Sequence, residues 1–341
     1  MPQPQPQPPQ PPSDSGNTQP LLLWGSVIAQ PNVDSAVPNE QLANPFQLPM
    51  ELLAIRFRLV PQVTEDDTNA RVTGGAVKVK IDLGPASVAS DIPISLFGNM
   101  RDTFENGAQV FAGPSAAADA GLAYPTMYEW RLKYPLFIPK GKVATAVFTP
   151  IGLNPMPVRV DVLYICRSWD PTKPEPRITK VPWAASFESK TFRYADGIGA
   201  DKSVSSNLDV SNPFGVPLEL SRIGGRCTTL ALSAESGAQT DLVYEDPNEF
   251  RQVLSTVRMR SSRGFDLIRT PVPFEGVFPI NWRAWEINSG WSMAPQEYYR
   301  VQVDTIAIAN TIDSSLIAAA QFAVGIVGYR DVEVASLRGA P

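Results

Sequence analysis

The sequence contains no histidine among its 341 residues. Without an imidazole there is no Ser-His-Asp or Cys-His catalytic arrangement, no His-ligated zinc and no H-E-x-x-H site. An enzyme made from this chain would need some other recognisable group of reactive side chains. The sequence therefore argues against an enzyme, and we expect no catalytic residues, no cofactor and no metal site.

Cysteine is nearly as scarce, with only Cys166 and Cys227 in the whole chain. Two thiols cannot form a disulfide framework, and no C-x-x-C spacing suitable for a metal is present. The sequence also has no Asn-x-Ser/Thr glycosylation site. These absences predict free thiols in a protein made in a reducing cytoplasm.

Charge is sparse as well, because Asp, Glu, Lys and Arg make up 18% of the residues and the net charge is −5. No dense block of Lys and Arg stands out, which argues against a sequence-specific nucleic-acid partner. The longest apolar run, Ser315–Val327, is too short and too interrupted by Gln and Gly to cross a bilayer.

Three segments partly match known functional motifs. Gly197–Ser203 resembles a phosphate-binding loop but lacks the G-x-x-x-x-G-K-[ST] spacing. Gly290–Ala294 resembles a nucleophile elbow whose last glycine is replaced, and no histidine base exists to serve it. The acidic cluster Glu65–Asp67 lacks the twelve-residue calcium loop. We interpret all three as surface or structural segments.

Frequent proline and glycine, 34 and 23 residues respectively, leave little room for long helices. The segments Leu53–Val60, Ala76–Leu83 and Arg300–Ile308 alternate apolar and polar residues, which predicts half-buried strands. Apolar spacing near three and four residues predicts short helical turns around Ile94–Phe104 and Asn248–Val257. The sequence predicts an all-β fold with short helical inserts.

A nine-residue phrase occurs twice: Asn44–Leu52 reads NPFQLPMEL, and Asn212–Leu220 reads NPFGVPLEL, an offset of 168 residues. A tryptophan precedes each copy, and this favours two similar domains produced by duplication. We expect Pro45 and Pro213 to fix the approach to an early strand of each half. The landmarks of the repeat are Trp24, Asn44, Pro45, Phe46 and Glu51, then Trp183, Asn212, Pro213, Phe214 and Glu219.

The two tryptophans, Trp24 and Trp183, precede the repeated phrase in matching fashion. One interpretation is that the tryptophans of this chain line a sugar-binding face. A packing role before the first strand of each half, repeated by duplication, is the simpler interpretation.

The expected organisation has five parts. A Pro/Gln-rich arm at 1–20 would be extended and solvated, and a proline-stiffened linker at 170–177 would join the halves. The predicted boundaries are 1–20 for the arm, 21–169 for the first domain, 170–177 for the linker, 178–335 for the second domain and 336–341 for the tail.

Together these features resemble one known family. Two similar all-β halves in an acidic, histidine-free chain, each with a tryptophan and an N-P-F-x-x-P-x-E-L phrase, are similar to the double-jelly-roll major capsid proteins. That lineage includes the capsid proteins of tectiviruses and the adenovirus hexon, and bacteriophages are among its members. The resemblance implies two tandem eight-stranded jelly rolls and brings no catalytic residue.

The resemblance also implies a function. Three chains would form a homotrimer with a pseudo-hexameric outline, and such capsomers would build an icosahedral shell in the virion after synthesis in the host cytoplasm. Partners would be the same chain and neighbouring capsomers, with penton, minor capsid proteins or an internal membrane as candidates for contact with the arm. The alternative is a virion spike or a tandem carbohydrate- or receptor-binding β-sandwich protein.

Overall fold

The computed structural model describes twelve ranges of the chain: 18–46, 48–62, 77–97, 126–151, 157–189, 192–193, 204–231, 242–244, 253–278, 285–286, 291–308 and 319–338. Most of the predicted arm at 1–20, the acidic cluster Glu65–Asp67 and the loop Gly197–Ser203 lie outside these ranges. The structure therefore bears on the strands and on the contacts between them.

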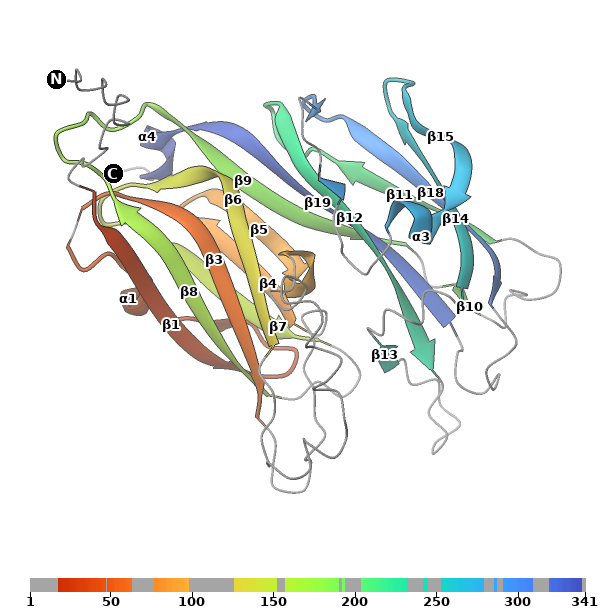
Figure 1. Cartoon of the computed structure of the whole chain (residues 1–341), viewed down its shortest axis with the longest axis horizontal. Helices are drawn as coiled ribbons and strands as arrows, with labels where there is room; N and C mark the ends of the chain where they lie inside the picture. The colour runs from red at the N-terminus through yellow and green to blue at the C-terminus, as the bar shows by residue number, and fades with distance from the viewer. Residues whose placement is uncertain are drawn as a thin grey trace, which may run out of the picture.

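The chain has an all-β, jelly-roll fold, as the sequence predicted (Figure 1). One four-stranded sheet faces the viewer in the N-terminal half. Its strands, in spatial order, are β1 (Pro20–Ala29), β8 (Val158–Ser168), β3 (Met50–Pro61) and β6 (Thr126–Ile138). A second four-stranded sheet lies in the C-terminal half. Its order is β11 (Val204–Ser211), β18 (Tyr298–Ile308), β14 (Val253–Ser261) and β15 (Asp266–Pro273).

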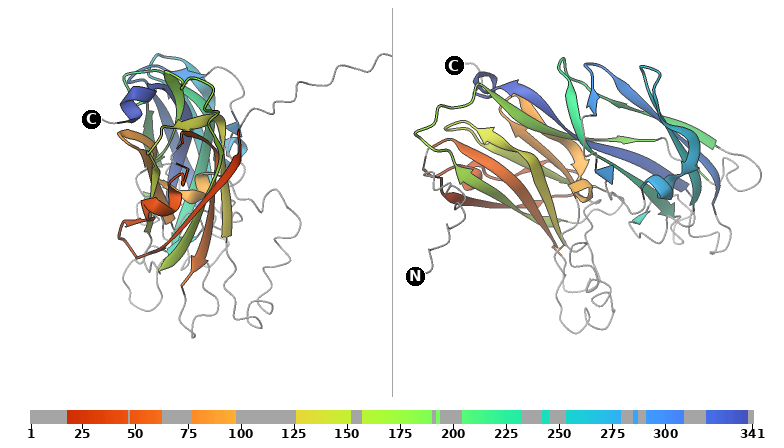
Figure 2. Two further views of the ribbon diagram at one scale, coloured as in Figure 1. Left: turned by 90° about the vertical axis from the view of Figure 1, so that its left-hand side faces the viewer. Right: turned by 45° about the horizontal axis from the view of Figure 1, so that its top comes forward.

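An eleven-stranded sheet runs through both halves (Figure 2). Its main path is β13 (Leu242–Tyr244), β12 (Leu218–Ala231), β19 (Ala319–Glu333), β9 (Ile178–Glu188), β5 (Ala86–Pro93), β4 (Val77–Leu83), β7 (Ala144–Pro150) and β2 (Ser35–Ala36). Three short strands pair beside this path: β10 (Phe192–Arg193), β16 (Trp285–Glu286) and β17 (Ser292–Met293). The three alternating segments of the sequence are confirmed as β3, β4 and β18, with every second residue of β4 buried.

Helices are short inserts, also as predicted: α1 (Asn39–Leu42), the 3₁₀ turn η2 (Ile94–Phe97), α3 (Phe274–Val277) and α4 (Val334–Leu337). The expected turn at Ile94 is confirmed by η2. The expected helical turn over Asn248–Val257 is wrong at its C-terminal end, because Val253 begins strand β14. Every second residue along this part of the strand is buried, namely Ser255, Val257 and Met259. This is the pattern of a half-buried strand and not of a helix. None of the helices in the described ranges is long and apolar enough to cross a membrane.

Both halves repeat one strand order. In the first, β1-β8-β3-β6 faces β2-β7-β4-β5; in the second, β9-β19-β12 with β16 and β17 faces β11-β18-β14-β15. Each pair of sheets encloses an apolar core, as expected when two half-buried sheets pack face to face. Phe57, Phe148 and Trp130 lie in the first core, and Phe274, Phe322 and Met293 lie in the second.

The register shifts in the strand pairing also recur at matching places in the two halves. The β3–β8 register shifts between Leu52 and Ala54, and the β12–β19 register shifts between Leu220 and Arg222, the same place in the repeated phrase. The hairpins β4–β5 and β14–β15 likewise carry two successive shifts each. Because a bulge is a specific local feature, its recurrence at matched positions supports an origin by duplication.

The two halves are joined through the eleven-stranded sheet. Strand β5 of the first half pairs in parallel with β9 of the second, with Ala89 opposite Ala184 and Ser90 opposite Ala185. Strand β6 packs over β9, where the backbone N–H of Phe137 donates to Thr179 Oγ1 at 3.4 Å. The halves therefore share a sheet and a packing layer in addition to the covalent connection.

Residues from the C-terminal part of the chain complete the first core. Val181, Ala184, Ala323, Val327 and Leu337 all belong to the apolar cluster of the first half. Leu337 is fully buried there at the end of α4, which lies beside the N-terminal half in Figure 1. The two cores are adjacent parts of one packed structure.

Candidate functional site

The repeated phrase forms the same turn in both halves. Asn44 Oδ1 accepts a hydrogen bond from the Phe46 backbone N–H at 2.9 Å, and its Nδ2 donates to the Leu48 carbonyl at 2.8 Å. Asn212 makes the equivalent bonds to Phe214, at 2.9 Å, and to Val216, at 3.0 Å. The asparagine side chain thus replaces the backbone partners that a turn would otherwise need.

The second asparagine has additional partners. Asn212 Nδ2 also lies 3.1 Å from the carbonyl oxygen of Met293 and 3.0 Å from that of Ala294. Its backbone N–H donates to the Glu297 carbonyl at 2.9 Å, and only 1% of the residue is exposed, compared with 8% for Asn44. Asn212 therefore connects the start of β12 to the segment that carries β17.

The two phenylalanines of the phrase differ more strongly. Phe46 is 64% exposed, whereas the Phe214 ring lies 5.1 Å from Trp183 in an edge-to-face arrangement. The guanidinium of Arg330 lies 3.7 Å from the centre of the same Phe214 ring, within the range of a cation–π contact. The repeated residue packs between strands in the second half and faces solvent in the first.

The two glutamates of the phrase, Glu51 and Glu219, have different partners. Glu51 pairs with Arg167 inside the first half. Glu219 accepts hydrogen bonds from Tyr134 Oη at 2.7 Å, Lys133 Nζ at 2.8 Å and Lys180 Nζ at 3.4 Å. Because Lys133 and Tyr134 belong to β6, the second glutamate bonds the two halves to each other.

This contact shifts the pKa of the glutamate. The hydrogen bond from Lys133 is the main reason that the pKa of Glu219 lies below its ordinary value of 4.5, and it also raises the pKa of Lys133. Tyr329 extends the contact, since its hydroxyl oxygen accepts the Lys133 backbone N–H at 2.6 Å and its ring lies 5.1 Å from that of Tyr134. We call Lys133, Tyr134, Lys180, Glu219 and Tyr329 the inter-half polar cluster.

We expect Glu219→Gln to lower the free energy of unfolding by about 1–2 kcal/mol at pH 7, because charge-assisted bonds in a partly exposed site are lost. A lowered folded-state pKa stabilises the protein fully above the unfolded value near 4.5 and loses that effect as the pH falls through the folded value. The difference between the native protein and the variant should thus shrink below about pH 4.5. Urea titrations from pH 3 to pH 8 would measure it.

The matched control for this experiment is Glu51→Gln, which removes the equivalent carboxylate without touching the contact between the halves. A loss of stability in Glu219→Gln that stays constant across the acid range would contradict the assignment.

Arg330 of β19 makes a further contact between the two halves. Its Nη2 donates to the Ser87 carbonyl of β5 at 2.9 Å, while its Nη1 is buried and has no hydrogen-bond partner among the described residues. Burial lowers the pKa of this arginine to about 10. The side chain therefore links β19 to the first half at the cost of desolvating a charge.

The expectation that Trp24 and Trp183 occupy matching positions with a shared packing role is not supported. Trp183 is 5% exposed within β9, whereas Trp24 is 53% exposed within β1. Gly328 of β19 and Cys166 of β8 are equivalent positions of the two ladders. Trp183 lies opposite Gly328 and Leu21 lies opposite Cys166, so Trp183 is the equivalent of Leu21 and not of Trp24. Both tryptophans precede the repeated phrase, but the ladder register places them three residues apart.

The sequence contained a better tryptophan match that the repeat phrase did not indicate. Trp130 of β6 lies opposite Ile55, and Trp285 of β16 lies opposite Ile223, the equivalent residue of β12. The intervening loops differ in length, so only the strand register identifies this pair. The inter-half polar cluster was also missed, because its members are far apart in sequence.

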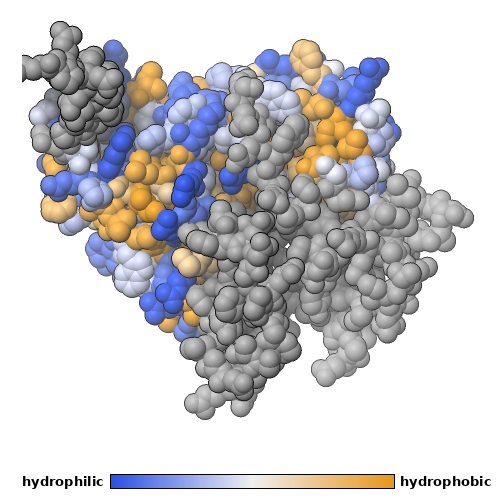
Figure 3. All heavy atoms as spheres, in the orientation of Figure 1, coloured by the Kyte–Doolittle hydropathy of each residue, from blue (hydrophilic) through white to orange (hydrophobic). Residues whose placement is uncertain are grey.

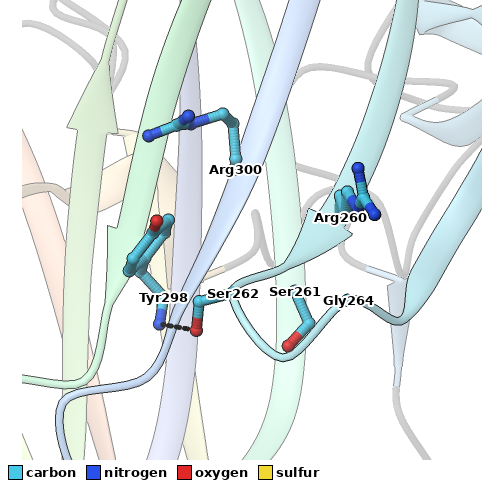
Figure 4. A pocket seen from close by; sticks show the side chains of 6 residues that line it. All are labelled: Arg260, Ser261, Ser262, Gly264, Tyr298 and Arg300. Carbon is cyan, nitrogen blue, oxygen red and sulfur yellow. Dashed lines mark hydrogen bonds between the residues drawn. The ribbon is translucent and has the colours of Figure 1, made fainter.

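One surface pocket lies where the turn between β14 and β15 meets the start of β18 (Figure 4). Its volume is about 210 Å³, and it is lined by Arg260, Ser261, Ser262, Gly264, Tyr298 and Arg300. Both arginines already pair with carboxylates, Arg260 with Asp266 and Arg300 with Asp209. Within the described ranges, no group of three or more Cys, Asp or Glu residues is placed to hold a metal ion.

The partly matching elbow motif also has a structural explanation where it is described. Trp291 directly precedes the short strand β17, which contains Met293, and the Trp291 carbonyl accepts the Leu220 backbone N–H at 2.7 Å. Met293 is fully buried in the second core. This segment pairs with β12 and packs inside the second half.

Comparison with known proteins gives no matching family model and no matching curated sequence. Three similar solved structures come from viruses. The Sputnik virophage structure is 8% identical, covers 98% of this chain and 92% of its own, and has a TM-score of 0.35. The Macrobrachium rosenbergii nodavirus structure is 9% identical, with 98% and 97% coverage and a TM-score of 0.22. A triple-jelly-roll protein of an archaeal virus is 10% identical, with 94% and 61% coverage and a TM-score of 0.21.

Proposed function

We propose that this chain is a structural capsid protein made of two jelly rolls, three copies of which form a pseudo-hexameric capsomer of an icosahedral shell. The observation that carries the proposal is the duplicated strand order with matched bulges, fused side by side through β5 and β9. The two rolls are taken as 21–169 and 178–335, joined by 170–177.

The physical logic is one of symmetry. A closed ring of six similar units fits a hexagonal lattice position, and a chain that carries two such units needs only threefold symmetry to fill it. A rigid junction between the rolls favours this use, because it fixes the angle between consecutive units. The shared sheet and the inter-half polar cluster supply that rigidity here.

The same reasoning defines the partners. The chain would contact two further copies within a capsomer and other capsomers around it, and it would reside in the virion. We propose the Pro/Gln-rich arm as the segment that reaches a neighbouring component, with penton, minor capsid proteins and an internal membrane as the candidates. The assembly needs neither catalysis nor a cofactor.

Size-exclusion chromatography with light scattering tests the proposal. We expect a particle of three times 37.1 kDa, and negative-stain electron microscopy of the same peak should show a six-lobed outline. A stable monomer would overturn the capsomer. A monomer that also binds glycans on an array would favour a carbohydrate-binding or spike protein.

A further inference from the structure

The junction inside the chain is a template for a junction between chains. Strand β5 ends the sheet segment β2-β7-β4-β5 of the first half, and β9 begins the segment β9-β19-β12 of the second. The two strands pair in parallel through Ala89–Ala184 and Ser90–Ala185, while β6 covers β9. One edge of the first half is thus completed by one edge of the second.

The equivalent edges on the outer sides of the molecule have no partner strand in the described structure. By strand order, β15 is the counterpart of β5, and β1 is the counterpart of β9. Each is the last strand of its four-stranded sheet, at opposite ends of the molecule in Figure 1. Strand β15 is poorly buried along its length, with Asp266, Arg269, Thr270 and Pro271 exposed. An uncovered strand edge is a ready site for pairing with another chain.

The open part of the β1 edge can be located. The Ser26 backbone N–H points away from β8 and donates to Gln41 Oε1 of α1 at 2.9 Å. In an antiparallel pair, residues two apart point their backbone groups to the same side, so Leu22 and Trp24 also direct theirs to the outer edge. Helix α1 covers the edge at Ser26, which leaves the section around Leu22 and Trp24 accessible.

Exposed apolar side chains gather at the same place. Leu22 is 64% exposed and Trp24 is 53% exposed, and their neighbours across the ladder on β8 are Ile165 and Leu163. Figure 3 shows apolar residues over the face that carries β1, β8 and β3. The corresponding β9 face in the second half is covered by β6. An apolar strand edge that no described residue of the chain covers indicates an interface.

The ladders give a register for the missing contact. Gly328 lies opposite Trp183 and Cys166 lies opposite Leu21, so Ala184 corresponds to Leu22 and Ala185 to Leu23. In the hairpins, Pro93 lies opposite Lys78, and Pro273 lies opposite Thr256. After the first register shift of each hairpin, Ala89 lies opposite Ile81 and Ile268 lies opposite Met259, so Ala89 corresponds to Ile268 and Ser90 to Arg269.

We propose that β1 of one copy pairs in parallel with β15 of a second copy, with Leu22 opposite Ile268 and Leu23 opposite Arg269. The contact is head-to-tail, so each chain uses β1 toward one neighbour and β15 toward the other. This inference rests on the proposed function, because closure after three copies makes six similar junctions, three within chains and three between them.

A disulfide tests the register directly. Neighbouring strands lie about 4.8 Å apart, which is within the Cα separation that a disulfide spans. The full chain carrying Leu22→Cys and Ile268→Cys would be treated with oxidised glutathione and separated by non-reducing electrophoresis. We expect most of the chain to shift into covalent dimers and trimers, with the cyclic trimer as the end product and complete reversal by reductant.

The native cysteines require a matched background. Cys166 is 2% exposed, and burial raises the pKa of its thiol to about 12, so it stays protonated and unreactive. Cys227→Ser would be included in every variant to remove the other thiol. The single variants Leu22→Cys and Ile268→Cys are the controls. Efficient dimerisation of Leu22→Cys alone would mean that β1 meets β1, and this would overturn the head-to-tail arrangement.

Light scattering separates this inference from the proposed function. A trimer of the double variant without cross-linking would overturn the β1–β15 pairing and leave the capsomer proposal intact, whereas a monomer would overturn both. The oligomeric state of two lysine variants, measured without cross-linking, is a second test of the pairing. Leu22→Lys should abolish the trimer, and Ile178→Lys, at a strand residue that is 58% exposed elsewhere, should not. A trimeric Leu22→Lys variant would contradict the pairing.

Discussion

Replacing Trp130 with alanine is expected to lower the free energy of unfolding by about 3–5 kcal/mol, the range for removing a large buried aromatic side chain. Trp130 is 2% exposed and stacks on Phe97 with 4.4 Å between ring centres. Phe97 stacks in turn on Phe57 at 5.5 Å, and Phe57 meets Phe148 edge to face at 6.0 Å. The variant would lose one end of an aromatic row that crosses the first core.

Denaturant titration followed by circular dichroism would measure this loss, at matched protein concentration because assembly also contributes to apparent stability. Trp130→Phe should recover part of it, since a smaller ring still contacts Phe97. Trp24→Ala is the control, with a change within about 0.5 kcal/mol under conditions that keep the chain monomeric. Equal losses in Trp130→Ala and Trp24→Ala would contradict the burial described for them.

The second large effect concerns the asparagine of the second repeat. Asn212→Ala should lower the free energy of unfolding by about 2–4 kcal/mol, because buried backbone groups lose their partners together. The Phe214 N–H and the carbonyls of Val216, Met293 and Ala294 all bond this side chain. A cavity takes its place in a site that is 1% exposed.

Asn44→Ala is the matched control, because among the described residues the first-repeat asparagine bonds only Phe46 and Leu48. Its expected cost is about 1 kcal/mol. Thermal unfolding of both variants beside the native chain would compare them. If Asn44→Ala were the more damaging change, the turn itself would be the stabilising feature, and the added contacts to Met293 and Ala294 would contribute little.

The sequence predicted what is local and repeated. Alternation in Ala76–Leu83 identified β4, and the repeated Asn-Pro-Phe phrase identified two equivalent turns whose side-chain bonds match within the described structure. Strand alternation depends on burial of one face, and an asparagine turn depends on a few neighbouring backbone groups. Both are properties of short segments, which sequence patterns record well.

Properties that depend on distant segments were not predicted. Glu51 and Glu219 occupy the same position of the repeated phrase, yet one pairs within its own half and the other bonds Lys133 and Tyr134 of β6. The parallel pairing of Ala89 with Ala184 leaves no trace in either local pattern. Trp24 was matched to Trp183 from their order before the repeated phrase, because the ladder register that separates them is a property of the folded sheet.

Leu337, buried in the first core although it lies at the far end of the chain, has a consequence for the history of the molecule. Residues such as Ala184, Val327 and Leu337 fill the core of the first half, so removing the second half would leave the first with exposed apolar surface. Under the origin by duplication that we propose, the two halves are therefore inherited as a single unit.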